Sequence, residues 1–115
     1  METKINYSEI AKQYYTAYEN QDKQTVADLL LDDFTFCSPN DDYIAKDVYF
    51  EKCWAMSDEN PKFSFESILE NGSDVFVFYK CETQSKRKFR NVELIRFKRN
   101  KIQAIEVYFG NALHV

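Results

Sequence analysis

Glycine and proline are scarce in this chain, with two of each among 115 residues. Disordered and low-complexity chains are rich in such residues and poor in aromatic ones, whereas this chain has ten Phe, eight Tyr and one Trp. Since the chain is also shorter than the roughly 150 residues typical of one domain, we expect a single folded domain over residues 1–115.

Long hydrophobic runs are also absent, and there is no excess of basic residues. The segment Met1–Ser8 lacks the apolar stretch of a secretory signal, and no run elsewhere is long enough to span a membrane. Fifteen Lys and Arg against nineteen Asp and Glu give a net charge of −4, the wrong sign for neutralising phosphates. We therefore predict a cytoplasmic protein that binds neither membranes nor nucleic acid.

Cysteine and histidine are too few for the common metal and disulfide frameworks. The three cysteines, Cys37, Cys53 and Cys81, are odd in number and show no CxxC spacing. The single imidazole, His114, is the second-last residue of the sequence, where a surface position is typical. The sequence predicts reduced structural thiols, no metal site and no cofactor.

Helical periodicity is confined to the first half of the chain. Asn6 and Glu9 have the spacing of a capping box, which predicts a helix that continues to about residue 20. Asp22 can cap a second, shorter helix that ends near residue 30. After turn-forming residues at 38–42, a third helix is predicted over residues 44–57.

Strand periodicity dominates after Pro61, and Asn71-Gly72 is a strong hairpin signal. Helices first and strands last indicate an α+β fold, with the helices on one face of a curved sheet. A short strand is predicted over residues 34–37, followed by four long antiparallel strands over 63–69, 75–81, 89–97 and 103–109.

The alternation of side chains within these strands predicts which residues face the helices. In the strand over 89–97, Glu93 shares the apolar face with Phe89, Asn91, Ile95 and Phe97. A carboxyl group on such a face needs a polar partner, for which Tyr14 and Asn91 are the candidates. In the last strand, the inward face is predicted to carry Gln103, Ile105, Val107 and Phe109.

The segment Val75–Tyr79 is apolar on both faces of the predicted sheet. An antiparallel sheet rarely has this pattern unless both faces are covered, and the helices can cover only one. We therefore expect a homodimer that packs through the outer face of the sheet.

Several short segments, in their order and spacing, resemble the NTF2-like superfamily, in particular its SnoaL-like branch and the bacterial ketosteroid isomerases. They are Asn20-Gln21-Asp22, the run from Leu29 to Phe36, Ser38-Pro39, Lys46-Asp47-Val48, Ile95-Arg96-Phe97 and Tyr108-Phe109-Gly110. The resemblance implies a cone in which three N-terminal helices pack on a strongly curved, mostly antiparallel sheet. It also implies a pocket at the open end and dimers through the outer sheet face.

The same resemblance implies roles for three positions. Tyr14 falls where ketosteroid isomerases keep the tyrosine of the oxyanion hole, and Glu93 falls where they keep a protonated acid. Their general base is an Asp directly before a Pro, a place that Ser38 occupies here. Because an unaided serine hydroxyl is far too weak a base, steroid isomerisation by that mechanism is not expected.

Other groups near the pocket are open candidates for the missing base. Asp41 and Asp42 follow Ser38 closely, although paired Asp residues in a turn are typically solvated, and His114 is the other candidate. The basic cluster Lys86-Arg87-Lys88 is interpreted as a solvated hairpin turn.

The sequence thus predicts an apolar pocket that binds a small apolar organic molecule bearing a carbonyl or hydroxyl group. If the protein is an enzyme, the chemistry is a cofactor-free isomerase-, dehydratase- or cyclase-like reaction in which Tyr14 and Glu93 act. A non-catalytic binding or structural homodimer is the alternative, and a protein-transport adaptor is a third possibility that no residue singles out. The predicted ligand-binding residues are Tyr18, Phe36, Ser38, Phe50, Trp54, Asn91, Val107 and Phe109.

Overall fold

A computed structural model describes residues 5–112 of the chain. Three α-helices are present in this range: α1 (Tyr7–Glu19), α2 (Lys23–Leu29) and α3 (Lys46–Cys53), the last continued by the 3-10 helix η1 (Trp54–Glu59). The strands are β1 (Leu30–Ser38), β2 (Asp41–Ala45), β3 (Lys62–Asn71), β4 (Asp74–Glu82), β5 (Lys88–Lys98) and β6 (Lys101–Ala112).

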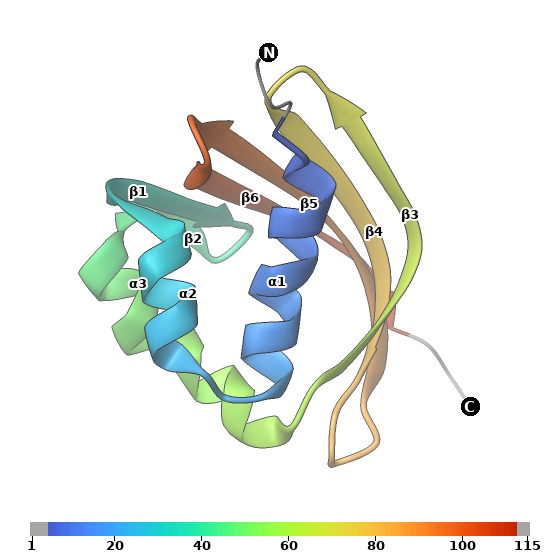
Figure 1. Cartoon of the computed structure of the whole chain (residues 1–115). Helices are drawn as coiled ribbons and strands as arrows, with labels where there is room; N and C mark the ends of the chain where they lie inside the picture. The colour runs from blue at the N-terminus through green and yellow to red at the C-terminus, as the bar shows by residue number, and fades with distance from the viewer. Residues whose placement is uncertain (1–4, 113–115) are drawn as a thin grey trace.

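The six strands form one sheet in the order β2-β1-β6-β5-β4-β3. All neighbours are antiparallel except β1 and β6, which run parallel. The sheet curves strongly, and the helices lie in its concave side (Figure 1). The architecture is therefore α+β with a mostly antiparallel sheet, as predicted.

The first two helices begin at the predicted caps. The side chain of Asn6 accepts a hydrogen bond from the backbone N–H of Glu9 at 3.2 Å, and Asp22 accepts one from Thr25 at the same distance. Such caps satisfy backbone donors that the first turn leaves free. The buried face of α1 is aromatic and carries Ala11, Tyr14, Tyr15, Ala17 and Tyr18.

The predicted third helix was wrong at both ends. Residues 41–45 form β2, in which Ile44 pairs with Phe36 and Ala45 with Thr35 of β1. Backbone pairing with β1 thus replaces the first helical turn, and α3 begins only at Lys46. From Trp54 onward the helix tightens into η1, which changes the direction of every later side chain.

A bulge in β6 corrects the predicted alternation of that strand. Phe97 pairs with Ile102, but the preceding residue Arg96 pairs with Ala104, so Gln103 is extra. Ile102 and Ile105 are consequently both fully buried, although strict alternation predicts that they lie on opposite faces.

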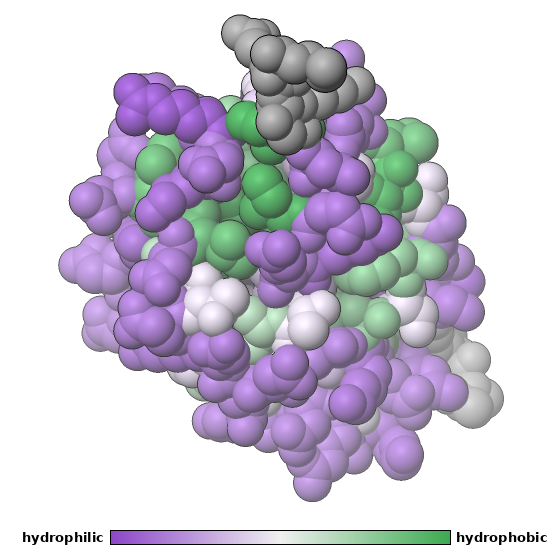
Figure 2. Space-filling model, viewed as in Figure 1, coloured by the Kyte–Doolittle hydropathy of each residue, from purple (hydrophilic) through white to green (hydrophobic). Residues whose placement is uncertain are grey.

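The helices cover only one of the two faces of the sheet. On β4, Val75, Val77 and Tyr79 are buried under the helices, whereas Phe76 and Phe78 on the outer face stay partly exposed. On the helical side, hydrophilic residues dominate the surface, and hydrophobic ones show through in its middle and along the edge where β3 lies (Figure 2). None of the helices within residues 5–112 is long and apolar enough to span a membrane.

Candidate functional site

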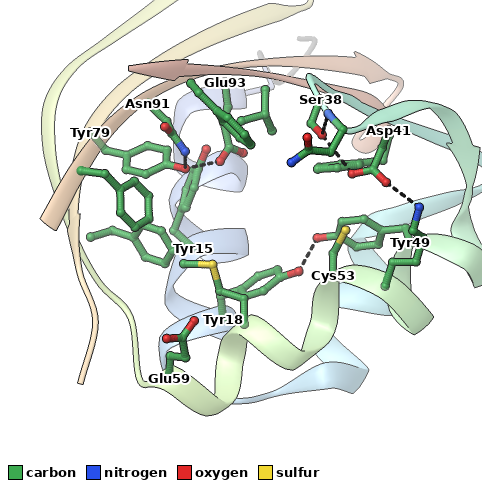
Figure 3. A pocket seen from close by; sticks show the side chains of 18 of the residues that line it. Tyr15, Tyr18, Ser38, Asp41, Tyr49, Cys53, Glu59, Tyr79, Asn91 and Glu93 are labelled. Carbon is green, nitrogen blue, oxygen red and sulfur yellow. Dashed lines mark hydrogen bonds and ion pairs between the residues drawn. The ribbon is translucent and has the colours of Figure 1, made fainter. Parts of the chain in front are cut away.

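A cavity of about 710 Å³ lies between the helices and the concave side of the sheet (Figure 3). This volume suits a small organic molecule. The lining is mainly aromatic and apolar, with a few polar groups: Tyr14, Tyr15, Tyr18, Phe36, Ser38, Asn40, Asp41, Tyr49, Lys52, Cys53, Ala55, Met56, Glu59, Phe63, Tyr79, Arg87, Lys88, Phe89, Asn91, Glu93, Val107, Phe109 and Gly110.

Glu93 supplies a buried carboxyl group to one wall of this cavity. Its side chain points inward from β5, and the residue is only 7% exposed. The hydroxyl of Tyr79 donates a hydrogen bond to Glu93 Oε2, and Asn91 Nδ2 donates to Tyr79 Oη at 3.2 Å. Asn91 Oδ1 in turn accepts a bond of 3.3 Å from the backbone N–H of Gly110. Neighbouring strands thus hold the carboxyl group in place through a chain of three hydrogen bonds.

Burial raises the pKa of the Glu93 carboxyl above its ordinary value of 4.5, and the hydrogen bond from Tyr79 opposes this shift only in part. Desolvation penalises the charged form, so the protonated form is favoured. A protonated carboxyl group whose Oε2 already accepts a bond from Tyr79 still has one hydrogen to donate. Whenever Glu93 is protonated, the cavity wall therefore presents an acidic hydrogen-bond donor.

Tyr15 adds a second polar group beside this carboxyl. The residue is 2% exposed and its hydroxyl lies near Glu93, yet that hydroxyl has no partner in hydrogen-bond geometry. Buried polar atoms without a partner are rare in folded proteins. An oxygen atom of a ligand in the cavity would give this hydroxyl an acceptor.

Three tyrosines form a separate network on the helical side. The hydroxyl of Tyr49 shares hydrogen bonds of 2.5 Å with Tyr14 and 2.6 Å with Tyr18. Tyr14 and Tyr18 reach the same partner because residues four apart lie one above the other on a helix. Within the described residues, the expected hydrogen bond between Tyr14 and Glu93 is absent. Tyr14 instead bonds to Tyr49 of α3, and Glu93 accepts its hydrogen bond from Tyr79.

Burial raises the pKa of Tyr14 well above its ordinary value of 10.0, and the nearby Tyr18 and Glu93 add to the shift. Tyr14 therefore stays protonated at any ordinary pH, although its hydroxyl is already shared with Tyr49.

The opposite wall carries an ionised carboxylate. Asp41 Oδ1 accepts a bond of 2.9 Å from Lys52 Nζ, and its Oδ2 accepts one of 2.9 Å from Ser38 Oγ. The bond from Lys52 holds the pKa of Asp41 below its ordinary value of 3.8, and Ser38 adds to this effect. The expectation of a solvated pair holds for Asp42, which is exposed, but not for Asp41, whose side chain is 11% exposed.

Most of the predicted site residues lie on the cavity wall. The structure brings together Tyr14, Tyr18, Phe36, Ser38, Asn91, Glu93, Val107 and Phe109. Phe50 and Trp54 do not line the cavity: Phe50 packs edge-on against Tyr49, and the Trp54 ring lies 4.8 Å from that of Tyr18. The early end of α3 explains the position of Trp54, because Trp54 begins η1 and Met56 of the same segment lines the cavity instead.

Three of the lining residues that the sequence did not predict are the tyrosines Tyr15, Tyr49 and Tyr79, whereas Asp41 was an open candidate for the missing base. Alternation along β4 could have revealed Tyr79. Val75, Val77 and Tyr79 point to the same face of the sheet as Asn91 and Glu93 of the neighbouring strand. No pattern marks Tyr49, since the helix that carries it was predicted two residues too early.

The basic hairpin and the thiols also have defined places. Arg87 and Lys88 line the cavity, although the sequence favoured a purely solvated turn; Arg87 is nevertheless exposed.

All three cysteines are free. Burial raises the pKa of the Cys53 thiol, which lines the cavity, to about 11, so it is protonated at neutral pH. Within residues 5–112 no group of three His, Cys, Asp or Glu side chains could hold a metal ion, and His114 lies outside this range.

A family comparison accounts for this combination of curved sheet and internal cavity. Residues 11–105 match the family described as SnoaL-like domain. The chain belongs to the SnoaL-like family. The match spans most of both the helical and the strand regions, so the family covers the whole cavity apart from the end of β6.

Solved structures with the NTF2-like fold superpose on this SnoaL-like domain. An NTF2-like protein of unknown function from Cytophaga hutchinsonii has a TM-score of 0.79 at 21% identity, covering 95% of this chain and 94% of that chain. A putative ketosteroid isomerase from Kribbella flavida has a TM-score of 0.74 at 13% identity, covering 92% and 78%. An LEH-like epoxide hydrolase from M. tuberculosis has a TM-score of 0.74 at 16% identity, covering 88% and 80%. At these identities the likeness concerns the fold alone.

No curated protein matches the chain.

Proposed function

We propose that this SnoaL-like domain binds a small, largely apolar organic molecule through an oxygen atom that accepts a hydrogen bond from Glu93. The observation that carries the proposal is the buried Glu93 carboxyl, which faces an aromatic cavity and is favoured in its protonated form. A neutral carboxyl group among apolar walls is a strong donor and adds no buried charge. The ligand class that suits it is a ketone, an ester or a similar carbonyl compound.

The same arrangement supports a cofactor-free isomerase-, dehydratase- or cyclase-like reaction. Donors placed where negative charge develops on an oxygen stabilise the transition state more than the bound substrate. Glu93 would serve as that donor, and the unpaired Tyr15 hydroxyl is the nearest second donor. A non-catalytic binding protein would use the same donors for recognition alone.

A matched pair of probes tests the binding proposal: 2-acetylnaphthalene, whose oxygen only accepts, and 2-ethylnaphthalene, which has nearly the same shape without that oxygen. The ratio of the two affinities, measured by equilibrium dialysis, should fall about tenfold in Glu93→Leu, the size of one good hydrogen bond. Glu93→Gln retains a donor and should keep the ratio.

The pH dependence has a defined sign. In the wild type, the preference for the ketone should be lost as the pH rises through the raised pKa of Glu93, because the carboxylate cannot donate. In Glu93→Gln the preference should not vary with pH. A ratio that is unchanged in Glu93→Leu would contradict the proposed binding mode.

We further propose that two copies pack through the outer face of the sheet. Phe78, Val92 and Tyr108 lie in one row across β4, β5 and β6, and Tyr108 is 56% exposed. The charged Arg96 on this face is paired within the chain, at 3.3 Å with Asp74 and 3.1 Å with Glu106. A second copy could therefore cover the row without leaving that cation unpaired.

A further inference from the structure

The β4–β5 turn and η1 lie at the same end of the molecule, where the cavity meets solvent (Figure 1). The backbone N–H of Gln84 in this turn donates a hydrogen bond of 2.7 Å to the carbonyl group of Glu59 in η1. Some lining residues are exposed and mark the opening: Asn40, Lys52, Ala55, Arg87, Phe109 and Gly110. A ligand that fills the cavity must pass these side chains.

Basic residues are more frequent around the cavity than in the rest of the chain. Besides Glu93, the lining has two acidic residues and three basic ones, Lys52, Arg87 and Lys88. The chain as a whole has nineteen acidic residues and only fifteen Lys and Arg. An opening with more positive than negative groups attracts anions to a protein that otherwise repels them.

Two of the three cations have no carboxylate partner in the chain. Lys52 is paired with Asp41 at 2.9 Å, but neither Arg87 nor Lys88 forms an ion pair within residues 5–112. The guanidinium group of Arg87 has five N–H donors and no acceptor. The donors of Arg87 are therefore free for an anion in the opening.

The turn also holds Arg87 in place. Its backbone N–H donates to Thr83 Oγ1 at 3.2 Å, and its carbonyl group accepts a bond of 3.0 Å from the N–H of Thr83. The guanidinium carbon lies 5.8 Å from the centre of the Phe89 ring, and Phe89 itself lines the cavity. A cation over an aromatic ring is attracted to it, so the side chain is placed before a ligand arrives.

The strand β5 connects this cation to the carboxyl group of Glu93. Phe89, Asn91 and Glu93 line the cavity from the same face of the strand. Four residues of a strand at about 3.3 Å each separate Phe89 from Glu93 by about 13 Å. One small molecule can therefore place an oxygen atom at Glu93 and an anionic group near Phe89, with an apolar body between them.

We propose that Arg87, assisted by Lys88, binds a carboxylate group of the ligand at the opening of the cavity, and that the ligand is an apolar keto acid. This inference rests on the proposed binding of the carbonyl oxygen at Glu93. A guanidinium group binds a carboxylate through two parallel hydrogen bonds, which a neutral ligand cannot form. Arg87 and Lys88 thus determine which charge the ligand carries, whereas Glu93 determines its orientation.

A matched pair of probes tests the carboxylate site: 6-acetyl-2-naphthoic acid, which is ionised at neutral pH, and 6-acetyl-2-naphthamide, which has nearly the same shape without the charge. Both carry the acetyl group, so the contribution of Glu93 cancels in the ratio of their affinities. Equilibrium dialysis at neutral pH and low salt should show that the full chain prefers the acid. In Arg87→Gln this ratio should fall about fivefold, the size of an exposed ion pair.

The neighbouring Lys86 provides the matched control. Lys86→Gln removes a positive charge from the same turn, but Lys86 is not among the described residues that line the cavity, so the ratio should stay close to the wild-type value. Arg87→Lys keeps the charge and should retain more of the preference than Arg87→Gln. Added salt should weaken the preference of the wild type, because salt screens an exposed pair.

Three results would overturn the carboxylate site. They are a wild type that binds the acid no more tightly than the amide, a wild-type ratio in Arg87→Gln, and an equal fall of the ratio in Lys86→Gln and Arg87→Gln. Since Arg87 is exposed, Arg87→Gln should unfold in urea at the wild-type midpoint, which verifies that a changed ratio does not come from a misfolded chain.

The two proposals fail in different ways. If the preference for 2-acetylnaphthalene over 2-ethylnaphthalene depends on Glu93 but the preference for the acid does not depend on Arg87, the carboxylate site is wrong and the binding function stands. If the preference for the acid depends on Arg87 but the preference for the ketone does not depend on Glu93, the binding function is wrong, and the keto acid is wrong with it.

Discussion

At the scale of single residues, Tyr49 joins three buried phenols into one network. Its hydroxyl is the shared partner of Tyr14 and Tyr18, and all three residues are less than a tenth exposed. Such a network connects α3 to α1 and fixes the positions of three side chains that line the cavity. Within residues 5–112, the hydrogen bonds between these two helices therefore depend on the Tyr49 hydroxyl.

We predict that Tyr49→Phe lowers the free energy of unfolding by about 1–3 kcal/mol, because two buried hydroxyls lose their partner at once. Tyr14→Phe should cost less, since Tyr49 keeps its bond to Tyr18. Urea unfolding of both variants measures the difference. Tyr43→Phe, at a residue that is 61% exposed, serves as the control and should leave stability unchanged. Equal stability of Tyr49→Phe and the wild type would show that the network contributes nothing.

The sequence predicts some of these residues and not others for a physical reason. Glu93 was placed correctly on the inward face, because alternation in a regular strand is a local property. The partner of Glu93 was not, because the choice between Tyr14 and Tyr79 depends on how α1 and β4 pack. Asp41 looked like a solvated turn residue, since no local pattern shows that Lys52 returns to meet it.

At the scale of elements, the strands were predicted better than the connections between them. The hairpin of β3 and β4 follows from Asn71-Gly72 and from alternation on both sides. The strand β2 was missed because it opens with two turn-forming Asp residues and ends inside the predicted helix, and only pairing with β1 makes it extended. The bulge at Gln103 was missed for the same reason: a register shift between strands leaves no trace in one strand's composition.

The elements also explain the position of the cavity. Parallel pairing places β1 beside β6, so the β1–β2 turn with Ser38 and Asp41 comes to the wall opposite Glu93. The early end of α3 brings Cys53 and Met56 to the same space and leaves Trp54 in packing contact with Tyr18. The position of Asp41 beside Lys52 thus depends on β2, which sequence patterns did not predict, and on α3, whose bounds they misplaced.

At the scale of the whole molecule, the outer face of the sheet is the surface proposed to join two copies. The apolar pattern of Val75–Tyr79 predicted that something covers this face, and the helices do lie on the other side (Figure 1). The SnoaL-like domain should therefore sediment as a species of twice the chain mass.

We predict that Tyr108→Lys converts this dimer to a monomer, because two copies of the new charge would face an apolar row without a partner. Since Tyr108 is 56% exposed in the single chain, the variant should still fold. Gln13→Lys, which places the same residue on the exposed face of α1, is the matched control and should remain dimeric. Sedimentation velocity that shows a wild-type monomer, or a dimer of Tyr108→Lys, would refute this interface.

The proposed recognition of a carbonyl oxygen depends on the protonation of one carboxyl group in the cavity, that of Glu93. A raised pKa means that the folded chain holds this proton more tightly than the unfolded chain, so the protein should lose stability as the pH rises above 4.5, the ordinary value for glutamate. The direct measurement is a carbon-13 NMR titration of the side-chain carboxyl of Glu93, assigned by comparison with Glu93→Gln. We predict a midpoint above 4.5, whereas a midpoint at or below 4.5 would contradict the proposed role of Glu93 as a hydrogen-bond donor.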